Sequence, residues 1–243
     1  MKIKLFHTLV LVVILAFATT AFAGDFASLS FIGFSSNGKY LAFEEYGTQD
    51  GSGFPYSNYY FINTSKNAFA APRVSVRIDN ESAKETAARA RAAAQAADKL
   101  KQFGIVTGNT GKLVVSHLLT DLTFDAAGKD LPNSVRFAEI IGSMYQEGDY
   151  EIDLRSVPIK TTECEKYGMD TFMLDLTLKY KGNDTSKTLQ KDNTLPASRG
   201  CALQYRIQDV YLYSGIVAVF INVYTQGFEG PDMRYMTVTG KLK

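Results

Sequence analysis

The residues FIGFSSNGKYLAFEEYGTQDGSGFPYSNYYFIN, numbers 31–63, carry the densest local signal for the fold. A short apolar run is followed by Asn37-Gly38, a pair that supplies the positive φ angles of a tight hairpin turn. Side chains of alternating character follow at 40–46, which is the period of a β-strand. After a glycine-rich loop at 48–58, the aromatic run at 59–62 predicts another strand. The stretch therefore predicts a three-strand antiparallel meander.

The rest of the chain has the same β character. Residues 172–180 alternate between apolar and polar side chains. Residues 216–224, IVAVFINVY, are almost wholly apolar and β-branched, which is typical of a central strand buried on both faces. Further strands are expected at 112–124, 150–157, 205–213 and 234–238, with an edge strand or connector at 70–77, a segment at 135–144 that fits strand or helix, and a polar loop at 182–200. We predict a mainly β, antiparallel, sandwich-like domain, with a small propeller-like assembly as the alternative.

One segment departs from this pattern. Residues 82–103 are rich in alanine and contain no glycine or proline, and Gly104 follows at the position where a helix would end. Ser82 and Glu85 fit a capping box. Arg89 and Arg91 are expected on a solvated helix face, and an anion site is the alternative. The expected contact stripe consists of Ala83, Ala87, Ala90, Ala94 and Ala97. The pattern predicts one helix inserted between two β segments.

The first 23 residues have the three parts of a secretory signal peptide. Lys2 and Lys4 precede an apolar core at 5–17, and Ala21-Phe22-Ala23 has the small residues of a cleavage site. The apolar core is shorter than the roughly 20 residues of a membrane span. We expect cleavage after Ala23 and export to the periplasm or the exterior. The mature protein, residues 24–243, is then a single domain without a membrane span.

The chain has two cysteines, Cys164 and Cys201. An even pair in an exported protein predicts a disulfide bond, and two unrelated buried thiols are the alternative. A zinc site is not indicated, because the mature chain keeps a single histidine, His117, and the cysteine spacing does not fit a zinc finger. The sequence indicates no metal and no cofactor.

Several function classes lack their sequence signals. The 26 basic and 25 acidic residues nearly cancel, and no nucleic-acid-binding module is present, so we expect no nucleic-acid partner. Phosphate-binding and dinucleotide-binding glycine motifs are missing, and so is a G-x-S-x-G nucleophile elbow. Ser116 and His117 are neighbours in an apolar strand pattern, where adjacent side chains point to opposite faces. The sequence names no catalytic residue and no partner.

Acidic residues near two loops are the remaining candidates for a binding site. The loops at 49–56 and 226–232 each combine glycine, proline, phenylalanine and acid, and the candidate residues on or beside them are Glu44, Glu45, Asp50, Glu229, Asp232 and Arg234. Paired carboxylates can hydrolyse glycosides or bind Ca²⁺, whereas acids at turns can also be solvated acceptors of backbone hydrogen bonds. We expect Phe54 and Phe228 to pack against the domain and to fix these loops.

Two functional hypotheses follow from these residues. The leading one is an exported, non-catalytic protein with a structural or ligand-binding role. The alternative is a carboxylate-based hydrolase that acts on envelope polysaccharide. A concave groove that joins the two loops would favour binding or catalysis, and separate convex loops would favour the structural role.

Three blocks of the sequence resemble a known family. SSNGKYLAFEEYGTQDGSGFPY at 35–56, LPASRGC at 195–201 and QGFEGPDMRYMTVTGKL at 226–242 are similar to the bacterial predicted secreted proteins of domain of unknown function 2259. The resemblance covers nearly all of the mature chain and implies export from a bacterial cell, without an assigned activity. The block FSSNGKYLAF also resembles one blade of a TolB-type β-propeller, although the repeats of a propeller are not found.

Overall fold

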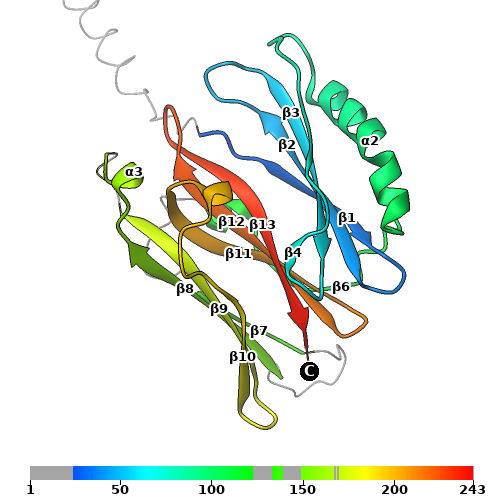
Figure 1. Ribbon diagram of the computed structural model, residues 1–243, viewed down its shortest axis with the longest axis vertical. Helices are drawn as coiled ribbons and strands as arrows, with labels where there is room; N and C mark the ends of the chain where they lie inside the picture. The colour runs from blue at the N-terminus through cyan, green and yellow to red at the C-terminus, as the bar shows by residue number, and fades with distance from the viewer. Residues whose placement is uncertain (1–23, 123–132, 139–148, 167, 169, 243) are drawn as a thin grey trace, which may run out of the picture.

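The computed structural model describes residues 24–122, 133–138, 149–166, 168 and 170–242 (Figure 1). Its strands form three antiparallel sheets. The first sheet contains β1 (Ser28–Phe34), β2 (Tyr40–Thr48), β3 (Pro55–Asn63), β4 (Ala68–Phe69) and β5 (Val74–Arg77). The second, in spatial order, contains β13 (Pro231–Lys241), β12 (Ile216–Gln226), β11 (Ala202–Tyr213) and β6 (Lys112–Ser116). The third contains β10 (Thr185–Lys191), β9 (Thr171–Tyr180), β8 (Tyr150–Ile159) and β7 (Ser134–Phe137).

Helices play a small part in the described chain. The one long helix is α2 (Glu85–Gln102), and the short ones are α3 (Thr162–Glu165), η1 (Leu119–Leu122) and η3 (Ala197–Arg199). Within the described ranges, no helix has both the length and the apolar character that a membrane crossing requires.

The strand β12 lies at the centre of the fold, as its sequence predicts. On one face, Val219 and Ile221 pack into an aliphatic core with the third sheet. On the other face, Phe220 and Tyr224 pack into an aromatic core with the first sheet. The second sheet is therefore the middle layer of three, and α2 covers the outer face of the first sheet (Figure 1). This stack confirms the mainly β, antiparallel, sandwich-like prediction.

The N-terminal meander is also confirmed. β1 and β2 pair antiparallel across the Asn37-Gly38 turn, and Gly38 has the positive φ of +70° that this turn requires. β3 begins at Pro55, earlier than the aromatic run predicts, because residues 55–58 pair with the end of β2. The glycine-rich loop is correspondingly shorter than the expected 48–58.

The helix is confirmed, but its details correct three predictions. It begins at Glu85 after Lys84, without a side-chain cap, so the capping box at Ser82 is wrong. The fully buried alanines are Ala88, Ala92 and Ala96, whereas three of the five expected stripe positions, Ala90, Ala94 and Ala97, are exposed. Alanine occurs on every face of this helix, so its sequence does not identify the buried side. Arg89 does not lie on a solvated face, because it pairs with a buried carboxylate on β2.

Two further segments differ from their predictions. The expected polar loop at 182–200 contains β10, a strand at the edge of the outermost sheet, where polar side chains can face water. The expected strand at 112–124 ends at Ser116 and is followed by η1, and its last two residues lie outside the described ranges. Of the ambiguous segment at 135–144, the described part belongs to β7 up to Phe137.

Candidate functional site

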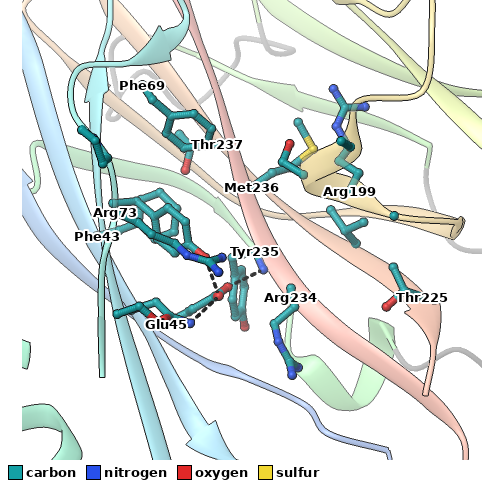
Figure 2. Close-up of a pocket in the computed structure, with 18 of the residues that line it drawn as sticks. Phe43, Glu45, Phe69, Arg73, Arg199, Thr225, Arg234, Tyr235, Met236 and Thr237 are labelled. Atoms are coloured by element: carbon teal, nitrogen blue, oxygen red, sulfur yellow. Dashed lines mark hydrogen bonds between the residues drawn. The ribbon is translucent and has the colours of Figure 1, made fainter. Parts of the chain in front are cut away.

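A cleft of about 1990 Å³ lies along the outer edge of β13. One wall is formed by side chains of β3 and β5. The opposite wall is the connection between β10 and β11, including residues 197–201. Figure 2 shows Glu45 and Tyr235 deep in this cleft, with Arg73 and Phe69 on one side and Arg199 on the other. The cleft therefore collects side chains from all three sheets.

Glu45 is the best-anchored predicted candidate in the cleft. It is 2 % exposed, and its Oε1 accepts hydrogen bonds from Tyr60 Oη at 2.7 Å and from Asn58 Nδ2 at 3.2 Å. Its Oε2 accepts a third bond from the backbone amide of Tyr235 at 3.0 Å (Figure 2). This amide lies on the outer edge of β13, so Glu45 ties the first sheet to the second. Its lone pairs are engaged in structural bonds.

Glu44 has a separate role on the opposite face of β2. It forms a two-pronged ion pair with Arg89 of α2, at 2.9 and 2.8 Å, and accepts a bond from Ser57 Oγ at 2.9 Å. Arg89 also stacks over the ring of Tyr46, 3.8 Å from its centroid. Because adjacent strand residues point in opposite directions, Glu44 and Glu45 do not share a site. The sequence analysis placed both residues on or beside a loop, but both lie within β2.

The two glycine-rich loops do meet. The amide of Glu229 lies 3.4 Å from Asp50 Oδ2, and the ring of Phe228 lies against Gly51. The prediction that both phenylalanines pack against the domain is wrong for Phe228, which is 81 % exposed. Phe54 is half-buried, with the Arg77 guanidinium 5.9 Å from its ring centroid. Of the acids on these loops, Asp50 accepts from the backbone amide of Glu229 and Asp232 accepts from that of Asp25.

Asp232 and Arg234 belong to a network that holds the start of the described chain. Asp25 forms an ion pair with Arg234 and accepts a bond from Tyr56 Oη at 2.9 Å, while its own amide donates to Asp232 Oδ1 at 3.1 Å. Burial raises the pKa of Asp25, and the nearby Arg234 opposes this shift. The sequence reasoning missed Asp25, because its role depends on a partner more than 200 positions away.

The opposite wall of the cleft is fixed by an ion pair and a disulfide. Asp192 and Arg199 form a buried pair, and Asp192 also accepts a bond from the amide of Leu174. Burial opposes ionisation of Asp192, but the bonds from Arg199, Leu174 and Gln190 together lower its pKa. Cys201 lines the cleft and is bonded to Cys164 of α3, which confirms the predicted disulfide.

The sequence comparison decides the family. The profile of the predicted secreted protein family DUF2259 matches residues 42–241, which include the cleft-lining residues from Phe43 to Thr237. The chain belongs to this family. Among curated proteins, none matches the chain. The family description supports secretion, and the position of the cleavage site stays a prediction.

This DUF2259 protein also has cleft residues that the sequence analysis did not select. Arg73, which directly precedes β5, and Ser75 and Arg77 of β5 line the cleft, and they alternate with Val74 and Val76, which are buried under α2. The alternation is visible in the sequence as RVSVR, so it could have indicated a strand with one cationic face. The proximity of this face to β13 could not be seen locally.

The neighbouring residues Ser116 and His117 of this DUF2259 protein form hydrogen bonds with β11. Ser116 Oγ donates to Asp209 at 2.7 Å, while His117 Nδ1 contacts the backbone oxygen of Ile207 at 2.8 Å. The serine hydroxyl thus bonds the acid directly instead of a histidine base, which is not the geometry of a hydrolytic triad. Among the described residues, no group of three His, Cys, Asp or Glu side chains is placed to hold a metal ion.

Proposed function

We propose that the protein is an exported, non-catalytic binding protein and that its ligand lies in the cleft along β13. The observation that supports this most strongly is the cleft itself, because buried networks fix the walls on both sides of it. Glu45 is held by three donors, and Arg199 is held by Asp192. Preorganised polar groups in a concave surface are a feature of ligand sites.

The same networks argue against the hydrolase alternative. A glycosidase needs two carboxyl groups on either side of one bond, with one able to donate a proton. Glu44 and Glu45 face opposite sides of β2, and each is engaged by neighbouring donors. Asp50 and Asp232 contact backbone amides. This arrangement favours binding over hydrolysis.

Export is part of the proposal. Close behind the expected cleavage site the chain already pairs with β13, because the amide of Ala27 donates to Met233 O at 3.0 Å. Cleavage after Ala23 would leave this docked segment intact. Mass spectrometry of the protein from its own cell is expected to find Gly24 as the first residue, and a mature pool that starts at Met1 would contradict export.

Thiol protection tests the binding site directly in a mixture of envelope components. Ser75→Cys places a thiol in the cleft, and Ser156→Cys places one at an exposed position on β8 outside it. A concentrated extract of the cell envelope should slow alkylation of the first thiol and leave the second unchanged. Equal rates with and without extract at Ser75→Cys would contradict the proposed site.

A further inference from the structure

Arg73 differs from the other arginines of the cleft. Arg199 and Arg234 are paired with the buried acids Asp192 and Asp25, and Arg77 pairs with the exposed Asp79. Within the described part of the chain, Arg73 forms no ion pair, although it lines the cleft. Its guanidinium group is therefore available to an anion from outside the protein.

The surroundings of Arg73 keep its hydrogen-bond donors open. It lies beside the hydroxyl group of Tyr60, and that hydroxyl donates its proton to Glu45. A guanidinium group has five N–H donors in a planar fork that fits a carboxylate, and one hydroxyl oxygen uses only part of this capacity. Next to Tyr60, at a ring-centroid distance of 6.1 Å, Phe69 presents a ring that is 61 % exposed.

The edge of β13 disfavours an extended peptide as the ligand. The amide of Tyr235 already donates to Glu45, and the amide of Thr239 donates to Asn67 Oδ1 at 2.9 Å. A peptide that paired with this edge would displace both side chains, which is how natural sheets block strand addition. Between these positions, Thr237 Oγ1 is buried at the cleft without a hydrogen-bond partner among the described residues.

The size of the cleft indicates an oligomeric ligand. Its volume of about 1990 Å³ exceeds the roughly 300–1,000 Å³ of typical small-molecule pockets. The accessible groups include the exposed ring of Phe69, the hydroxyl group of Ser75 and the guanidinium of Arg73. Sugar rings have apolar C–H faces that pack on aromatic rings, and hydroxyl groups that bond to polar side chains.

We propose that the cleft binds an oligosaccharide that carries carboxylate groups. One carboxylate lies on the guanidinium fork of Arg73, a sugar ring packs on Phe69, and a sugar hydroxyl group bonds with Ser75. This inference rests on the proposed function and adds the chemical class of the ligand to it.

Calorimetric titration with a hexamer of galacturonic acid tests the inference. The matched pair of variants is Arg73→Gln, which removes the available charge, and Arg136→Gln, which removes an exposed arginine of β7 on the third sheet. The wild-type protein is expected to bind the hexamer, and Arg73→Gln should weaken binding by about tenfold or more, because a charge-assisted bond is lost. Arg136→Gln should bind like wild type. Circular dichroism establishes that both variants are folded.

Three outcomes would overturn the inference. The first is that the methyl-esterified hexamer, which carries no charge, binds as tightly as the acid. The second is that hexaglutamate binds as tightly as the galacturonic acid hexamer. The third is that no titrated saccharide binds. The first outcome would reject only the acidic class, since a neutral saccharide would still occupy the cleft. Protection of the Ser75→Cys thiol by envelope extract tests the proposed binding site independently of these three outcomes.

Discussion

The two outer sheets are attached to the same middle sheet by different chemistry. The third sheet packs through aliphatic side chains such as Ile152, Leu176 and Val219. The first sheet packs through aromatic rings such as Phe43 and Phe220, and its contact includes buried hydrogen-bonded charges. Apolar packing is non-directional, whereas hydrogen bonds to charges fix the geometry of the groups that they join. The aliphatic side therefore supplies cohesion, while the aromatic and polar side positions groups around a cleft.

The disulfide is expected to give the largest single effect. It links α3, which joins two strands of the third sheet, to the start of β11 in the middle sheet. For a sequence separation of 37, the loop-entropy model predicts a stabilisation of about 4 kcal/mol, and measured values are often smaller. The double substitution Cys164→Ser with Cys201→Ser should lower the urea midpoint under non-reducing conditions. A wild-type midpoint that is insensitive to reductant, after thiol titration has established complete reduction, would contradict this role.

Loss of the charge at Glu45 should weaken the attachment of the first sheet. Glu45→Gln keeps an acceptor oxygen but loses the charge that strengthens three hydrogen bonds, and we expect about 1–3 kcal/mol of destabilisation. The matched control is Glu229→Gln, an exposed acid expected to change stability by less than about 0.5 kcal/mol. Urea unfolding of both variants measures the difference. Equal free energies of unfolding would show that the polar contact does not stabilise this sheet.

The outer cover of the first sheet can be tested at two alanines of the same helix. Ala92 is fully buried against the sheet, so Ala92→Leu should overpack the contact and cost about 1–3 kcal/mol. Ala94 is exposed, and Ala94→Leu should change the free energy of unfolding by less than about 0.5 kcal/mol. If thermal unfolding shows that Ala94→Leu destabilises the protein more than Ala92→Leu does, the buried side of the helix is the one expected from the sequence.

The outer face of the third sheet should show a small effect that depends on pH. Hydrogen bonds from Lys179, Arg136 and Lys181 lower the pKa of Glu151 from 4.5 to about 2. Because its pKa is lower in the folded protein, Glu151 stabilises the fold above pH 4.5, and this contribution is lost as the pH falls toward 2. Glu151→Gln should flatten the pH dependence of unfolding in that window at low salt. If the pH dependence of unfolding is the same in Glu151→Gln as in the wild type, the ion cluster does not contribute to stability.

The success of sequence reasoning follows the range of the interactions involved. The Asn37-Gly38 turn, the doubly buried strand at 216–224 and the alanine-rich helix depend on local conformation and on periodicity, and all three are confirmed. The buried face of the helix was missed because alanines lie on every side of it. The strand β10 was missed because an exposed edge strand has the polar composition of a loop.

The candidate site was harder to predict than the fold. Glu45 and Arg234 were selected from their neighbourhood in the sequence, and both do line the cleft. Their roles depend on partners from other strands: the amide of Tyr235 for Glu45, and Asp25 for Arg234. Arg73 acquires its significance only when ion pairs are assigned across the whole cleft, which requires the assembled sheets.

The most direct test of the central claim is an amide-resolved NMR titration of the mature protein with the galacturonic acid hexamer. Signals of Ser75, Tyr235 and Thr237, on the cleft side, should shift with a saturable dependence on the hexamer concentration. Signals of β8 and β9 in the third sheet should stay in place, and Arg73→Gln should suppress the shifts. Shifts centred on the third sheet, or cleft signals that do not move at saturating hexamer, would contradict the assignment of binding to the aromatic and polar side of the molecule.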